Sequence, residues 1–185
     1  MFLWLAGFIA IIWGVEAVNS LVDHRISEFG IVPRTTEGLR GILLWPFLHA
    51  GFGHLISNTL PMAVLGSVIA MQGRRALLQV SVIVILVAGV GVWAVARHGT
   101  HVGASGLVFG YFGYLVARGW YQRSFTAIVV AILVVFFYGG LIFGIVPSFG
   151  FVSWEGHLFG LLAGILAAKI IDEKKPDKSS QVEPD

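Results

Sequence analysis

Long stretches without a charged residue divide this chain and constrain its fold more than any other feature. A helix that crosses a bilayer needs roughly 20 mostly apolar residues, with a range of about 17 to 25. Five stretches meet this requirement, residues 2–18, 53–71, 76–96, 125–146 and 153–171, and a sixth, residues 102–117, is slightly short but also qualifies as a span. The pattern predicts an all-α polytopic membrane protein with six transmembrane helices.

The composition agrees with a membrane environment. The chain has 185 residues, of which 57% are hydrophobic and only 12% charged, whereas soluble domains carry about 25% charged residues. The lipid bilayer is therefore the expected surrounding, with one membrane domain over residues 1–171. Residues 172–185 are polar and predict a disordered cytoplasmic tail. We expect residues 1–18 to be a retained first helix, because a basic n-region and a clear cleavage site are missing.

Basic residues in the connections predict the orientation, since cytoplasmic loops carry more Lys and Arg. One side has eight: Arg74, Arg75, Arg118, Arg123, Lys169, Lys174, Lys175 and Lys178. The other side has four: Arg25, Arg34, Arg40 and Arg97. We expect the first side, with both termini, in the cytoplasm. Two external loops of modest size and a short tail suit a bacterial inner membrane. Residues 19–46 are expected to form the longer of these external loops.

Four polar residues fall at similar depths in the predicted helices. His54, Asn58, Ser105 and His157 lie near the external ends of helices two, four and six. A helix rises 1.5 Å per residue, so a group four residues inside lies about 6 Å along its axis. Polar residues within spans are costly and are functional candidates. The spacing predicts a shallow polar pocket that opens to the external side.

Glycines provide a way to bring two of these residues together. Residues 103–106 read Gly-Ala-Ser-Gly, and glycines recur every four residues at Gly156, Gly160 and Gly164. Small residues at this spacing let two helix backbones approach closely in lipid. We expect helices four and six to pack so that Ser105 Oγ reaches the His157 ring.

A serine hydroxyl becomes a nucleophile when a histidine within about 2.6–3.2 Å takes its proton. The resulting oxyanion needs donors, and the Asn58 amide, the His54 ring and the Ser105 backbone N–H are candidates. Glu155 is two positions from His157 and faces elsewhere on a helix, so a dyad without an acid is predicted.

Each residue alone also has a structural interpretation. A serine among small residues often serves helix packing, and an intramembrane His or Asn often bonds a neighbouring backbone. The glycines are packing devices in either case. The functional hypothesis rests on four polar residues at one side and one depth.

These residues match the motifs of a known family. Residues 46–58, Pro-Phe-Leu-His-Ala-Gly-Phe-Gly-His-Leu-Ile-Ser-Asn, resemble the second-helix signature of the rhomboid intramembrane proteases, with His54 and Asn58 at the His-x-x-x-Asn positions. Residues 103–106 match its Gly-x-Ser-Gly motif. Gly156-His157 with the following glycines matches its last-helix motif. The chain thus resembles a minimal six-helix rhomboid.

The resemblance implies Ser105 as nucleophile and His157 as base, with His54, Asn58 and the Ser105 backbone as the oxyanion site. The supporting residues it implies are Gly103, Gly106, Phe109 and Gly160. Many members have Tyr where this chain has Phe109, whose ring can still stack on the histidine. The resemblance also implies cleavage of single-span membrane proteins near an easily unwound segment, a lateral gate at helix five, and a cap at residues 147–154.

Three alternatives stay open. A catalytically silent rhomboid-like protein binds membrane clients without cleaving them. A metal site is the second, because all six histidines fall near the external side: His24, His49, His54, His98, His101 and His157. A transporter is the third. We expect no metal, no cofactor and no nucleic-acid partner, and the oligomeric state is left open.

Overall fold

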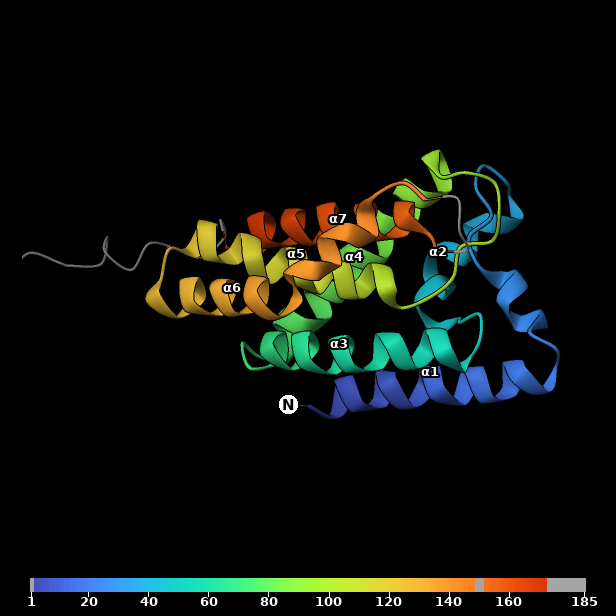
Figure 1. Cartoon of the computed structure of the whole chain (residues 1–185), viewed down its shortest axis with the longest axis horizontal. Helices are drawn as coiled ribbons and strands as arrows, with labels where there is room; N and C mark the ends of the chain where they lie inside the picture. The colour runs from blue at the N-terminus through green and yellow to red at the C-terminus, as the bar shows by residue number, and fades with distance from the viewer. Residues whose placement is uncertain (1, 149–151, 173–185) are drawn as a thin grey trace, which may run out of the picture.

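The computed structural model describes residues 2–148 and 152–172, and the long elements in them are all helical. Six long helices run roughly alongside one another (Figure 1). They are α1 (Leu3–Leu21), α3 (Phe52–Ala70), α4 (Arg74–Val95), α5 (Ser105–Gln122), α6 (Phe125–Tyr138) and α7 (Trp154–Asp172). The predicted all-α bundle is confirmed.

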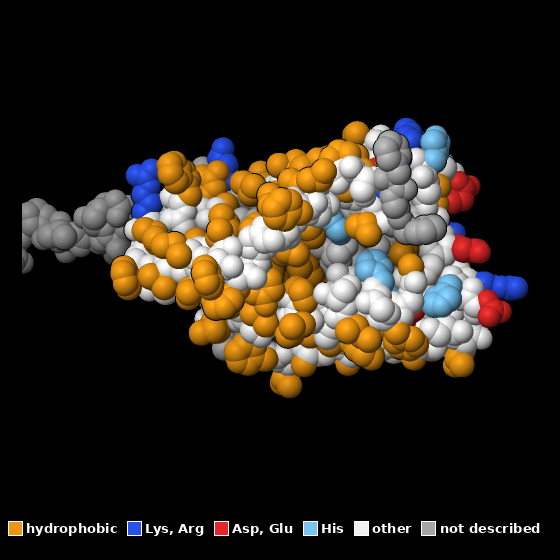
Figure 2. Space-filling view, viewed as in Figure 1, with side chains coloured by type: hydrophobic (Ala, Val, Ile, Leu, Met, Phe, Trp, Pro, Cys, Tyr) orange, Lys and Arg blue, Asp and Glu red, His pale blue; other side chains and the backbone are white. Residues whose placement is uncertain are grey.

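Hydrophobic side chains cover the middle of the molecule, and charged side chains gather at its two ends (Figure 2). Large apolar residues of α6 are strongly exposed, with Phe125 at 84% and Phe136 at 79%. Within the described residues, five helices are long and apolar enough to cross a membrane: α1, α3, α4, α6 with its continuation to Ile145, and α7. The chain is an integral membrane protein.

Helix α5 differs from the other five because protein surrounds it. It packs against α3, α4, α6 and α7, and an unbroken run of its residues, 106–115, is buried. A helix enclosed by protein does not need the apolar surface that lipid demands. This explains how its Tyr and Gly residues are accommodated at the centre of the bundle.

The bounds predicted for this helix, residues 102–117, were wrong at both ends. Gly103 has φ +119°, a conformation that glycine adopts readily and that no right-handed helix contains. The helix therefore begins after it, at Ser105, and continues to Gln122. The other predicted spans differ from the observed helices by a few residues, and the fifth ends in a 3₁₀ segment, η4 (Gly139–Ile145).

Helices α5 and α7 make the closest approach in the bundle. A Cβ added at Gly160 would overlap the carbonyl oxygen of Gly106, and one at Gly164 would overlap that of Gly110. No larger residue fits these positions without moving a backbone. The glycine spacing therefore sets the separation of the two helices, as the sequence predicted.

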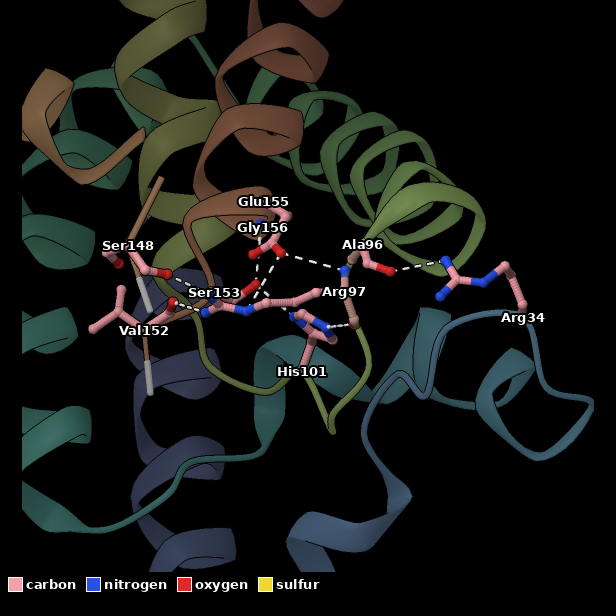
Figure 3. A network of polar contacts seen from close by, with 9 residues as sticks. All are labelled: Arg34, Ala96, Arg97, His101, Ser148, Val152, Ser153, Glu155 and Gly156. Atoms are coloured by element: carbon pink, nitrogen blue, oxygen red, sulfur yellow. Dashed lines mark hydrogen bonds and ion pairs between the residues drawn. The ribbon is translucent and has the colours of Figure 1, made fainter. Parts of the chain in front are cut away.

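The predicted external loop, residues 19–46, is a folded unit rather than an open connection. Asn19 belongs to α1, and short helices follow: η1 (Arg25–Phe29), η2 (Glu37–Leu39), α2 (Gly41–Leu44) and η3 (Trp45–Phe47). Ile31 pairs with His101 through two backbone hydrogen bonds, and the Arg34 side chain donates to the Ala96 carbonyl at 2.8 Å (Figure 3). The loop thereby supports the segment that leads into α5.

Two predictions extend beyond the described residues. Residues 149–151 of the predicted cap lie outside them, and so does nearly all of the predicted tail, from residue 173 onward.

Gly164→Ala should destabilise the fold by about 1–3 kcal/mol, because the added methyl overpacks the contact with α5. Gly14→Ala is the matched control, since no atom lies within 4 Å of a Cβ at this position in α1 and alanine favours helix. Unfolding midpoints in detergent micelles measure both. Equal midpoints for the two variants would contradict the proposed role of the glycine contact.

Candidate active site

Ser105 and His157 meet where α5 and α7 begin. Ser105 is the first residue of α5, and His157 lies in the first turn of α7. The His157 Nε2 atom is 2.9 Å from Ser105 Oγ, and the histidine is only 8% exposed. The predicted close approach of these two side chains is present.

A backbone carbonyl sets the tautomer of His157. Its Nδ1 atom lies 2.9 Å from the carbonyl oxygen of Gly144 in η4. A carbonyl can only accept, so Nδ1 carries the hydrogen and Nε2 presents a lone pair. The Ser105 hydroxyl therefore donates to Nε2, which is the arrangement a general base needs.

The ring of His157 is also held by stacking. Phe109 lies one turn after Ser105, and its ring is 4.1 Å from the His157 ring, with 6° between their planes. Glu155 turns away from the histidine, as predicted, and accepts from the Arg97 backbone N–H at 3.3 Å. The base is therefore oriented by a carbonyl and an aromatic ring.

The predicted oxyanion donors lie on α3, beside the turn that precedes Ser105. The His54 ring packs directly on Gly103, where a Cβ would lie 2.8 Å from His54 Nε2. Asn58 is 6% exposed, and its Nδ2 has no hydrogen-bond partner among the described residues. An unused buried donor is costly, which makes this amide a candidate donor to an oxygen that enters the site.

Gly106 is tightly packed between the external loop and α7. A Cβ at Gly106 would lie 2.5 Å from the Trp45 ring and 2.9 Å from the Gly156 carbonyl oxygen. The Trp45 carbonyl in turn accepts from the Gly103 N–H at 2.9 Å. These contacts join the external loop, α5 and α7 around Ser105.

A cavity of about 770 Å³ opens beside the pair, and Ser105, His157 and His54 are among the residues that line it. Its rim carries Arg97 and His98 from the connection between α4 and α5. The cavity is large enough for several residues of an extended peptide. It leads from the end of the molecule that carries mixed charges to the Ser105 hydroxyl.

Sequence reasoning missed a polar network that extends from α1 to the turn before Ser105. The Asn19 amide donates to the His49 carbonyl at 3.1 Å, and its oxygen accepts from the Ile26 N–H at 3.0 Å. His49 Nε2 accepts from the Ala104 N–H at 3.3 Å. The fully buried Glu16 accepts from the same Asn19 amide at 3.1 Å. A signal was present, because polar residues cluster at the end of the first predicted span.

His49 is neutral in this network. Burial, followed by the proximity of His54, lowers its pKa from 6.5 to about 4. A neutral ring is required here, since a protonated Nε2 is no longer an acceptor for the Ala104 N–H.

No three His, Asp or Glu side chains within residues 2–148 and 152–172 gather in a way that would hold a metal ion. The six histidines therefore do not form a cluster in this part of the chain.

The lowered pKa of His49 predicts acid sensitivity. The unfolded chain binds a proton at His49 below pH 6.5 and the folded chain only near pH 4, so the free energy of unfolding falls across that interval, by up to about 3 kcal/mol. His49→Gln keeps an acceptor near the Nε2 position but does not titrate, and it should flatten this loss. Unfolding midpoints between pH 7 and 4 measure the effect, with His98→Gln as the exposed-histidine control. An unchanged slope in His49→Gln would refute the assignment.

Comparison with known proteins places these residues in a family. The rhomboid domain model matches residues 36–174. An uncharacterized protein of Mycobacterium tuberculosis (strain H37Rv) is 36% identical, and the match covers 91% of this chain and 76% of that protein. An uncharacterized protein of Mycobacterium leprae (strain TN) is 34% identical over 91% of this chain and 72% of its own length. The domain match includes every residue of the candidate site, and the chain belongs to the rhomboid family.

Proposed function

We propose that this protein is an intramembrane serine endopeptidase that hydrolyses peptide bonds in or next to the transmembrane segments of single-span membrane proteins. The rhomboid family is an intramembrane protease family. The observation that carries the proposal is the 2.9 Å contact between Ser105 Oγ and His157 Nε2, with the other ring nitrogen donating to Gly144.

The proposed reaction begins with attack of Ser105 Oγ on the scissile carbonyl carbon. The Ser105 proton moves to His157 Nε2, and a tetrahedral oxyanion forms. Collapse breaks the C–N bond, and His157 gives its proton to the leaving amine. A water molecule then attacks the acyl-enzyme, again with His157 as base, and releases the new carboxylate and the free serine.

Stabilisation of the oxyanion is assigned to the Asn58 amide, the His54 ring and the Ser105 backbone N–H. The unpartnered Asn58 Nδ2 supports this role. Ser105 opens α5, where backbone N–H groups have no partner within the helix. Donors fixed in advance in a site of low polarity stabilise developing charge more strongly than water does.

We propose that the substrate enters from the lipid beside α6. This helix has only Ala127 and Val134 buried, and it packs mainly on α5. Its continuation, η4, carries the Gly144 carbonyl that orients the base. A helix held by few buried side chains can move aside at low cost, as a lateral gate requires.

The orientation proposed for the molecule follows its charge distribution. The cavity opens at the external side, and the opposite end, with Arg74, Arg75, Arg118 and Arg123, faces the cytoplasm. A bacterial inner membrane is the proposed location.

Ser105→Ala and His157→Ala should each abolish cleavage of a fluorescent single-span substrate in liposomes, because each removes one partner of the proton transfer. Ser57→Ala is the matched control. Ser57 also lines the cavity, but its hydroxyl donates to the His54 carbonyl at 2.8 Å and takes no proposed part in the reaction.

Full activity in Ser105→Ala would refute the mechanism. Wild-type protein that binds the substrate without cleaving it would instead support the silent client-binding alternative.

Asn58→Ala should lower kcat by about 10²–10³-fold with little change in KM, since the lost donor acts on the transition state. Asn58→Asp keeps the size of the side chain but removes its N–H donors, so it should lose as much. Steady-state kinetics on the same substrate measure kcat and KM for both variants. An unchanged kcat in Asn58→Ala would remove this residue from the oxyanion role.

A further inference from the structure

A second serine–histidine pair lies beside the first, with the two residue types exchanged. His101 Nδ1 is 2.6 Å from Ser153 Oγ. His101 precedes Ser105 by four residues, and Ser153 precedes His157 by four. Figure 3 shows His101 and Ser153 pointing toward one another between the entry to α5 and the start of α7. Both pairs therefore join the entry to α5 to the start of α7, and the segment that supplies the histidine in one pair supplies the serine in the other.

The hydrogens of the second pair can be assigned in the same way. His101 Nε2 lies 3.0 Å from the Arg97 carbonyl oxygen, so Nε2 carries the hydrogen and Nδ1 accepts from the Ser153 hydroxyl. Ser153 Oγ also accepts from the Gly156 N–H at 3.1 Å. Ser153 is thus the N-cap of α7, and its oxygen is tied to that helix.

His101 is itself firmly placed. It is 7% exposed, and its backbone N–H and carbonyl both pair with Ile31, at 2.8 and 3.0 Å. Its position is therefore fixed by the external loop. Only three residues separate it from the nucleophile, including Gly103, against which His54 packs.

Ser153 is hydrogen-bonded directly to His157 through the backbone. The His157 N–H donates to the Ser153 carbonyl at 3.2 Å, so both belong to the first turn of α7. Moving Ser153 away from His101 would move His157 away from Ser105.

A neighbouring ion pair joins the same segments. The Arg97 Nε atom is 3.4 Å from Glu155 Oε1, and the guanidinium also donates to the carbonyls of Ser148 and Val152 (Figure 3). These contacts hold the start of α7 near the end of α4. These contacts of the Arg97 side chain do not involve His101 or Ser153. The His101–Ser153 contact joins the two residues that lie four positions before Ser105 and His157.

We propose that His101 and Ser153 form a brace that sets the distance between Ser105 and His157, and that His101 is a positioning residue for the reaction. This inference rests on the proposed function. A reacting group misplaced by about 1 Å can cost about 10²-fold in rate, so loss of the brace should lower kcat with KM unchanged.

Two substitutions of His101 provide the test. Asparagine places an amide oxygen near the Nδ1 position and can still accept from Ser153, whereas glutamine places its amide near Nε2 and cannot. We expect His101→Gln to lower kcat at least about ten-fold and His101→Asn to stay within about two-fold of wild type. Kinetics on the single-span substrate in liposomes and unfolding midpoints in detergent are measured for each variant.

Substitutions of Ser153 test the brace independently of His101. Ser153→Thr keeps the hydroxyl and should keep the wild-type kcat, whereas Ser153→Ala should lose it. Both substitutions break the His101–Ser153 contact, and Ser153→Ala also removes the cap on the Gly156 N–H. The double variant His101→Gln/Ser153→Ala should therefore lose no more kcat than Ser153→Ala alone. If His101→Gln does not fold, the comparison of threonine with alanine at position 153 decides.

Several outcomes overturn the brace alone while wild-type cleavage upholds the proposed function. These are an unchanged kcat in His101→Gln, an equal loss in His101→Asn, and additive losses in the double variant. A raised KM with unchanged kcat would make His101 a substrate contact instead. If the wild type cleaves no substrate and Ser105 shows no nucleophilic reactivity, the proposed function and the brace are both overturned.

Discussion

The contact between α5 and α7 is the constraint on which the rest of the site depends. Glycines on α7 face backbone carbonyls on α5, so the helices approach as closely as two backbones allow. In lipid, such packing replaces the hydrophobic effect as the force between helices. The same approach brings the first residue of α5 within 2.9 Å of a histidine in the first turn of α7. The glycines thus set the separation of the two helices on which the Ser105–His157 contact depends.

The base is oriented without an acid, and the surroundings explain why. A buried carboxylate beside His157 would have to lose its hydration, which costs several kcal/mol unless it is fully paired. The Gly144 carbonyl fixes the same tautomer without a net charge. The Phe109 ring adds a flat apolar surface that restricts rotation of the imidazole. Glu155, two positions before His157, is engaged by Arg97.

Polar groups concentrate at one end of the bundle because hydrogen bonds can be completed there. Asn19 and His49 link α1 to the turn before Ser105, and His101 and Ser153 link that turn to α7. Polar contacts therefore reach the surroundings of Ser105 from two sides, both anchored in the folded external loop. This distribution keeps the polar residues of the candidate site close to water while the remaining bundle stays apolar.

The sequence alone was sufficient for the helical bundle, for the meeting of Ser105 and His157, and for the glycine contact, because hydropathy, helical rise and small-residue spacing are local properties. It also identified Phe109 as the ring partner, since one helical turn separates it from Ser105. The start of α5 was missed, because a positive φ at Gly103 depends on the His54 ring and the Trp45 carbonyl around it. Only the tertiary structure decided that a carbonyl of η4 orients His157 and that His101 meets Ser153. A backbone carbonyl has no signature in a sequence, and contacts between residues 52 positions apart arise from the packing of whole helices.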